Sequence, residues 1–301
     1  MNRFRGALLG LACGDAVGTT VEFSNRDEFE PLTDMVGGGP FNLKAGEWTD
    51  DTSMALCLAE SLIEKNGMDL DDQLRKYSKW KCEGYLSRTC SSTYIKAMIF
   101  YANTSPVLLY SLIAHYYDFS IGNGSIMRLA PVPLFFAGDR LAAINESGRS
   151  SITTHSHPIC QDACRLFGSI IFSALNADFC SKEEILFHQH NKPFSPLMQK
   201  IADGAYLDKT ESQICGSGYV VESLEAALWC FYTTDNFRDA ILKAANLGDD
   251  ADTTAAICGK VAGAFYGEDG IPIEWRKKLA MHDFICELAD KLRDHKGKQN
   301  E

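Results

Sequence analysis

The sequence lacks several features that would place it in a specialised class of protein. No apolar run reaches the roughly 18 residues of a membrane-spanning helix. No stretch alternates apolar and polar residues between hairpin turns, so the sequence requires no strands. Positive charge is in the minority, because 29 lysines and arginines stand against 40 aspartates and glutamates, a net charge of -11. Nucleic-acid backbones and anionic membranes would be repelled on average, and we expect neither as a partner.

The cysteines also lack the arrangement of a disulfide framework. There are 11 of them, an odd number, spread through helix-like segments. Reduced, buried thiols explain this distribution better than disulfides do, so we expect a soluble, cytoplasmic, acidic protein. A zinc site near His155 and His157 is the weaker interpretation of residues 155–164. Cys160 and Cys164 are four residues apart, whereas Cys-x₂-Cys spacing is the diagnostic one.

Helical periodicity runs through most of the chain. Apolar residues recur at helical spacing in 3–18, after residue 53, within 92–118, and in a series of segments between 138 and 294. Residues 24–47, with glycines and a proline at their centre, are predicted to be loop. With 301 residues, 46% of them hydrophobic, the chain can bury a large core, and no change in composition marks a linker. The predicted fold is all-α: a single-domain, multi-helix orthogonal bundle over residues 1–295, with a frayed tail at 296–301.

Two runs of threonine and aspartate stand at opposite ends of the chain, each at the start of a predicted helix. They are Trp48-Thr49-Asp50-Asp51-Thr52 and Gly248-Asp249-Asp250-Ala251-Asp252-Thr253-Thr254. Like charges this close repel, so solvent or a cation must relieve the repulsion, and carboxylate and hydroxyl oxygens suit Mg²⁺, Mn²⁺ or Ca²⁺. The alternative is a purely structural role, in which each run caps the N-terminus of a helix and its negative charges interact favourably with the helix dipole. Two runs of the same composition favour the two halves of one metal site.

Five short motifs follow one another along the chain. They are Gly14-Asp15-Ala16-Val17-Gly18 with Glu22, Trp48-Thr49-Asp50-Asp51-Thr52, Gly122-Asn123-Gly124-Ser125-Ile126-Met127-Arg128, Thr154-His155, and Asp250-Ala251-Asp252-Thr253. In this order they resemble the ADP-ribosylglycohydrolase family, which includes the dinitrogenase reductase-activating glycohydrolases and the ADP-ribosyl-acceptor hydrolases. The resemblance covers nearly the whole chain. Each motif is weak evidence alone, and the five together are strong evidence.

The resemblance implies an all-α fold whose central cleft holds two Mg²⁺ (or Mn²⁺) ions and an ADP-ribose unit. In the family, a glutamate at the position of Glu22 lies beside the metals. Cleavage at ribose C1″ needs a proton for the leaving group or an activated water, so Glu22 is the candidate general acid/base. Asp249 falls outside the matched positions and would support the ligands or face solvent. The implied metal ligands, three from each acidic run, are Thr49, Asp50, Asp51, Asp250, Asp252 and Thr253.

The expected contacts to ADP-ribose come from three other segments. Backbone N–H groups in the turn at 123–125 are free of bulky side chains and suit a diphosphate or a ribose oxygen. The alternatives are a simple tight turn there and a core tyrosine at the helix that follows residue 218. The substrate-binding residues that the resemblance implies are Asn123, Gly124, Ser125, Met127, His155, Gly218 and Tyr219.

One stretch departs from the family pattern. Family members often carry an acidic residue in a stretch like Asp-Ile-Gly-Asn-Thr, where this chain has the shorter Thr89-Cys90-Ser91-Ser92-Thr93. In the family that residue is associated with gripping the acceptor, such as an arginine guanidinium. Its absence puts arginine specificity in doubt, and with it full catalytic competence.

The sequence therefore predicts a divalent-metal-dependent hydrolase that cleaves the glycosidic bond between ADP-ribose and a modified acceptor, releasing ADP-ribose. The alternative is a catalytically weak or inactive ADP-ribose-binding or structural protein on the same scaffold. A Mg²⁺-dependent nucleotide phosphohydrolase ranks last, because no glycine-rich loop with a lysine precedes a helix. The sequence leaves open the acceptor linkage, the choice between Mg²⁺ and Mn²⁺, and the oligomeric state.

Overall fold

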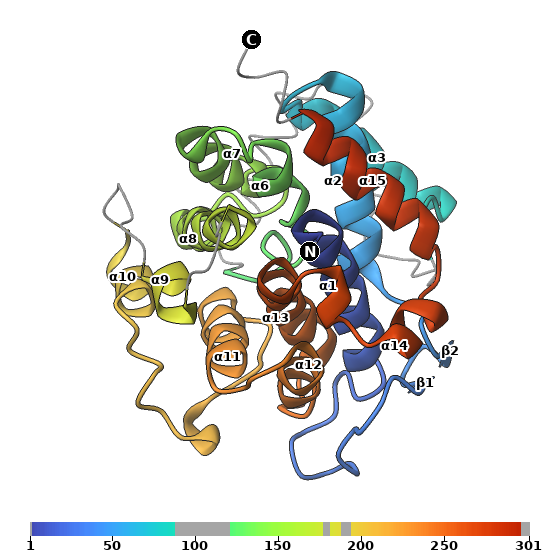
Figure 1. The fold of residues 1–301 in the computed structure, drawn as a ribbon, viewed down its shortest axis with the longest axis vertical. Helices are drawn as coiled ribbons and strands as arrows, with labels where there is room; N and C mark the ends of the chain where they lie inside the picture. The colour runs from blue at the N-terminus through green and yellow to red at the C-terminus, as the bar shows by residue number, and fades with distance from the viewer. Residues whose placement is uncertain (1, 88–120, 177–180, 188–193, 296–301) are drawn as a thin grey trace.

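A computed structural model of the chain describes residues 2–87, 121–176, 181–187 and 194–295 (Figure 1). The described residues are mostly helical, and the all-α prediction is confirmed. In chain order, the helices are α1 (Arg3–Gly18), α2 (Asp50–Lys65), α3 (Leu70–Glu83), α6 (Pro131–Phe135), α7 (Arg140–Ser151), α8 (Pro158–Leu175), α9 (Lys182–Leu186), α10 (Pro196–Ala202), η1 (Glu211–Gln213), α11 (Val220–Tyr232), α12 (Phe237–Ala245), α13 (Ala251–Tyr266), η2 (Glu268–Gly270), α14 (Ile273–Lys278) and α15 (His282–His295).

Helices α1 and α13 lie side by side at the centre of the molecule (Figure 1). Each has 16 residues, of which 14 are buried. A helix that is apolar on all sides needs protein around its whole circumference, and both sequences consist mainly of alanine, glycine and aliphatic residues. Their central position follows from this composition.

Glycines spaced four residues apart let the two helices touch backbone to backbone. A Cβ atom on Gly10 would lie 2.1 Å from the carbonyl oxygen of Gly259, and one on Gly263 would lie 2.0 Å from that of Gly6. The same closeness continues at Gly14, which faces Ala255. The pairing runs antiparallel, so the C-terminal end of α1 lies beside the N-terminal end of α13. This contact brings the first sequence motif next to the last one.

The other helices surround this pair. Helices α11 and α12 pack against α13, α2 and α15 pack against α1, and α7 packs against α8 (Figure 1). One cluster of buried apolar side chains extends from Phe4 in α1 to Leu292 in α15. None of the helices that the structure describes is long and apolar enough to cross a membrane.

A small antiparallel pair of strands corrects the expectation that residues 24–47 are loop throughout. β1 (Gly37–Gly38) pairs with β2 (Leu43–Lys44). Two-residue strands are too short to show alternation, so no periodic pattern predicts them. The helix expected within 92–118 and the tail at 296–301 lie outside the described residues, as does the stretch 89–93.

Candidate active site

Asp15 fixes the start of α2 against the end of α1. Its carboxylate is fully buried and accepts four hydrogen bonds, from the backbone N–H and the hydroxyl of both Thr49 and Thr52, at 2.6–2.9 Å. Burial raises the pKa of Asp15 to about 6, and the four donors oppose that rise. Asp15 belongs to the first of the five motifs, but no sequence pattern pointed to this supporting role.

The two threonine–aspartate runs meet through side chains. The Thr49 hydroxyl donates to Asp252 Oδ2 at 3.0 Å, and the Thr253 hydroxyl donates to Asp51 Oδ2 at 3.4 Å. Each bond joins one run to the other, and all four side chains are buried. Two segments far apart in the sequence therefore form one polar cluster in the interior.

The helix-cap interpretation of these runs is wrong for the two residues in the cap positions. Thr49 precedes α2 and Asp250 precedes α13, but neither side chain hydrogen-bonds to the first turn of its helix. Thr49 points to Asp15 and Asp252, while Asp250 Oδ2 accepts a hydrogen bond from the Asn123 amide at 2.7 Å. These side chains are directed across the cluster, which a simple capping role would not require.

Glu22 is the remaining acidic member of the cluster. Glu22 is 8% exposed and accepts a hydrogen bond from the Thr19 hydroxyl at 3.4 Å. Burial, together with the nearby aspartates, raises the pKa of Glu22 to about 8.

Pairing of main chains sets the position of Glu22. Residues 23–24 exchange backbone hydrogen bonds with Asp249, at 2.8 Å from Phe23 N and 2.7 Å to Ser24 O. Asp249 adopts a left-handed conformation with φ of 58°, and its side chain is exposed. Its backbone thus aligns the loop after α1 with the start of α13, and its carboxylate faces solvent.

The cluster carries negative charge that the protein leaves partly uncompensated. Burial raises the pKa of Asp51 and of Asp252 well above the ordinary range, and neighbouring carboxylates add to this effect. Asp51 Oδ1 is buried and has no hydrogen-bond partner. A buried carboxylate oxygen without a donor, surrounded by further oxygens, fits a divalent cation. The residues present therefore suit the expected ions.

However, no three of the predicted carboxylate ligands among the described residues bring their oxygen atoms within 4.8 Å of one another. In the part of the chain that the structure describes, the one group of three His, Cys, Asp or Glu side chains with ligand atoms within 4.8 Å of one another is Glu268, His282 and Cys286, at the far end of α13. The predicted ligands meet in threonine–aspartate pairs instead, and their assignment stays a prediction.

Two predicted substrate-binding segments lie beside Asp250. Asn123 N donates to Gly218 O at 3.1 Å, and Asp250 N donates to Gly216 O at 2.9 Å. Gly218 is exposed and Tyr219 is half-buried, and a Cβ atom on Gly218 would stand 3.4 Å from Asp250 Oδ2. The turn at 122–125, the segment at 216–220 and the start of α13 are thus hydrogen-bonded together around Asp250.

Other predicted substrate contacts are more enclosed. The Ser125 hydroxyl is buried and accepts from Ser151 at 2.9 Å, and the Met127 side chain is 6% exposed. The His155 ring packs against Gly124, where an added Cβ atom would lie 2.6 Å from it. Desolvation, with repulsion from Arg128, lowers the pKa of His155 to about 3, so the ring is neutral. Their roles in ligand binding stay predictions.

Two buried cations that sequence reasoning did not single out hold the 122–128 turn. Arg128 donates to Gly124 O and to the hydroxyls of Thr153 (3.0 Å) and Thr154 (2.7 Å). Lys260, on α13, donates to Ile126 O at 2.6 Å and to Met127 O. Burial lowers the pKa of Lys260 to about 7. Arg128 was part of a quoted motif, whereas Lys260 gave no signal beyond a lone charge in an apolar helix.

Comparison with known proteins shows what this chain is similar to. A family model described as ADP-ribosylglycohydrolase matches residues 1–301. ADP-ribosylarginine hydrolase Tri1 of Serratia proteamaculans is 40% identical, over 97% of this chain and 79% of that protein. ADP-ribosyl-[dinitrogen reductase] glycohydrolase of Rhodospirillum rubrum is 33% identical, over 93% and 91%.

A solved structure titled ADP-ribosylglycohydrolase-related protein complex has the same fold. It superposes with a TM-score of 0.85 at 35% identity and covers 98% of both chains. The protein is thus an all-α hydrolase with a buried acidic site. The chain belongs to the ADP-ribosylglycohydrolase family, which confirms the resemblance carried by the five motifs.

Proposed function

We propose that this protein is a divalent-metal-dependent hydrolase that releases ADP-ribose from an arginine-linked acceptor. The observation that carries the proposal is the pair of hydrogen bonds, Thr49 to Asp252 and Thr253 to Asp51, that joins both acidic runs beside the buried Glu22. The choice of arginine rests on relatives at 40% and 42% identity that are named ADP-ribosylarginine hydrolase. It is proposed despite the altered stretch at 89–93.

The proposed ions are two Mg²⁺ or Mn²⁺, held by Thr49, Asp50 and Asp51 on one side and by Asp250, Asp252 and Thr253 on the other. When bound, they would orient the ribose hydroxyls and offset the negative charge of the aspartates around the site. Asp15 keeps Thr49 in place, and Asn123 holds Asp250 through its amide. The protein thereby supplies a rigid frame for the ribose.

Glu22 would move the proton in the proposed reaction. The C1″–N bond breaks, a water oxygen bonds to C1″, and the leaving nitrogen gains a proton. Glu22 can give up or accept this proton because burial beside the aspartates raises its pKa to about 8, near neutral pH. The turn at 122–125 and the segment at 216–220 lie beside Asp250 and would hold the remainder of ADP-ribose.

The test measures ADP-ribose released from an arginine-ADP-ribosylated protein with Mg²⁺, with Mn²⁺ and with excess EDTA. We expect release with metal and loss in EDTA. Glu22→Gln should lower kcat about 10²–10⁴-fold, the usual range for a general acid/base. Asp249→Asn is the matched control and should retain activity, because its side chain faces solvent. Full activity of Glu22→Gln, or release that EDTA leaves unchanged, would contradict the proposal. ADP-ribose binding without release from arginine, serine or nucleic-acid ends would favour the binding-protein alternative.

A further inference from the structure

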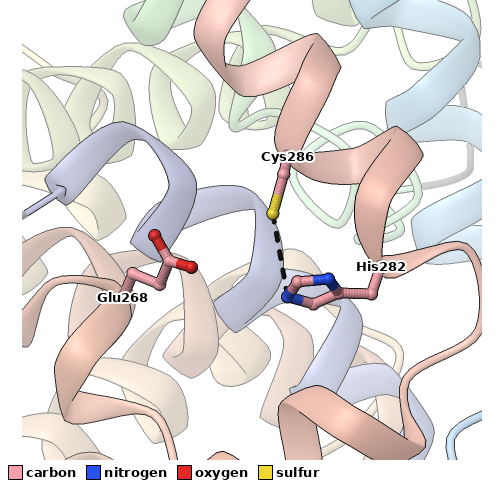
Figure 2. Close-up of side chains that lie close together, drawn as sticks. All are labelled: Glu268, His282 and Cys286. Carbon is pink, nitrogen blue, oxygen red and sulfur yellow. Dashed lines mark hydrogen bonds between the residues drawn. The ribbon is translucent and has the colours of Figure 1, made fainter.

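A second group of potential metal ligands lies away from the candidate active site (Figure 2). Glu268 belongs to η2, just after α13, and His282 and Cys286 belong to α15. One ligand atom from each lies within 4.8 Å of the others. Helix α13 has 16 residues, so about 24 Å of helix separates this group from the aspartates at its other end. The group is therefore independent of the site described above.

The helix places two of these ligands on one face. His282 and Cys286 are four residues apart, so their side chains lie one above the other along α15. Cys286 Sγ is 3.7 Å from His282 Nε2. On the opposite side of the ring, His282 Nδ1 is 2.9 Å from Asp283 Oδ1. A carboxylate at Nδ1 keeps the proton there and leaves the Nε2 lone pair directed at the group, as in many metal-binding histidines.

Glu268 completes the group from a different element. Figure 2 shows its carboxylate on the side toward His282 and Cys286. Both of its oxygens contact arginines: Oε1 accepts a hydrogen bond from Arg276 Nη1 at 3.4 Å, and Oε2 forms an ion pair with Arg5 Nη1 at 3.6 Å. Arg5 makes its shorter contacts with Asp290, at 2.5 and 3.1 Å, so its ion pair with Glu268 is the weaker one. A metal ion would take one of the Glu268 oxygens from its arginine.

The ligand atoms of these three side chains indicate which cation the group would bind. A thiolate, an imidazole and a carboxylate together are the ligands of zinc and related transition metals, whereas Mg²⁺ and Ca²⁺ select oxygen alone. A reactive cysteine is the weaker interpretation. Cys286 is 6% exposed, and burial raises the pKa of its thiol to about 11.

We propose that Glu268, His282 and Cys286 form a second metal site, for a zinc-class transition-metal ion, that fastens α15 to the end of α13. On binding, the Cys286 thiol passes its proton to solvent, His282 binds through Nε2, and Glu268 binds through a carboxylate oxygen. A water can take the fourth position. The ion would link the C-terminal helix to η2, and so to the helix that carries Asp252.

Cobalt provides a specific test, because a thiolate bound to Co²⁺ gives a charge-transfer absorption band that the oxygen-only active site cannot produce. Titration of the wild-type protein with Co²⁺ should give this band, and Zn²⁺ should displace it. Cys286→Ser should abolish the band, and His282→Ala should weaken Co²⁺ binding at least tenfold. Cys82→Ser, which removes an exposed thiol on α3, should leave the band unchanged.

The same variants give a second readout. Zn²⁺ should raise the thermal midpoint of the wild type and of Cys82→Ser by several degrees more than that of His282→Ala. His282 has a side chain 30% exposed, so this variant keeps the test available if Cys286→Ser does not fold. No cobalt–thiolate band in the wild type, or a band that persists in Cys286→Ser, would overturn the proposal. An equal zinc-induced rise in His282→Ala would overturn it as well.

Discussion

At the scale of single residues, Asp15 makes the most demanding set of contacts in the candidate site. We expect Asp15→Asn to lower the free energy of unfolding by about 2–4 kcal/mol. The amide NH₂ group of asparagine would face two of the four N–H and O–H donors that the Asp15 carboxylate now accepts from, and two donors cannot hydrogen-bond to each other. It should also lower the rate of ADP-ribose release, since Thr49 loses its support. Urea unfolding and the release assay measure the two effects.

Asp249→Asn is the matched comparison for Asp15→Asn, since both replace an aspartate by its amide in the same region. The Asp249 side chain is exposed, and its left-handed backbone suits asparagine. Its free energy of unfolding should stay within about 0.5 kcal/mol of the wild type. Equal destabilisation by the two substitutions would show that Asp15 has no special structural role.

The lowered pKa of His155 leads us to expect a specific dependence of stability on pH. Its pKa is lowered to about 3 in the fold, against about 6.5 in the unfolded chain, so the unfolded state takes up the proton first. Stability from this group is complete above pH 6.5 and is lost as the pH falls toward 3. At pH 5.5 the loss is about 1.4 kcal/mol.

The matching experiment compares wild type with His155→Asn by urea unfolding at pH 8 and pH 5.5. Asparagine can keep the contact that Nδ1 makes with the Thr154 hydroxyl at 2.9 Å. The drop in stability between the two pH values should be about 1.4 kcal/mol smaller in the variant. An equal drop in both proteins would mean that His155 is charged in the fold.

At the scale of secondary-structure elements, the contact between α1 and α13 depends on glycine. In Gly10→Ala the new Cβ would meet the Gly259 carbonyl oxygen at 2.1 Å, and only a shift of a whole helix could relieve it. We expect a loss of more than about 3 kcal/mol, at the upper end for overpacking, despite the better helix propensity of alanine. Thermal and urea unfolding measure the loss.

Gly148→Ala is the control for this substitution, since Gly148 also lies within a helix, α7. Its added Cβ would meet the Arg165 side chain, at 2.6 Å from Nε, and that side chain can move. Its stability should change by less than about 1 kcal/mol. If Gly10→Ala were equally mild, the close backbone contact would not be what positions the two helices.

The sequence predicted helices better than contacts, for a physical reason. The ranges 3–18 and the start of α13 follow from local periodicity and small-residue composition, which any short window reveals. The pairing of Gly10 with Gly259 and the bonds from Asp15 to Thr49 join distant segments, and no local pattern records them. Likewise, residue types suggested an acidic site, but the burial of Lys260 beneath the 122–128 turn could be seen only in the folded chain.

At the scale of the whole molecule, the fold places a cluster of buried carboxylates at one end of its central helix pair. The chain already has a net charge of -11, so the cluster adds repulsion within an acidic protein. Burying Asp51 and Asp252 without full compensation costs stability, which the hydrophobic core around α1 and α13 offsets. If the proposed ions bind there, removing them should lower the free energy of unfolding of the whole protein.

The last prediction therefore concerns metal and stability together. An ion that binds the folded state at 100 times its Kd stabilises by about 2.7 kcal/mol, so Mn²⁺ should raise the thermal midpoint by roughly 5 °C over EDTA. Sodium chloride of equal ionic strength controls for screening. In EDTA, Asp51→Asn should have a higher thermal midpoint than the wild type, because the substitution removes a buried carboxylate. In Mn²⁺ it should have a lower midpoint than the wild type, because it lacks a metal ligand. A rise with Mn²⁺ as large in Asp51→Asn as in the wild type would place the ion elsewhere.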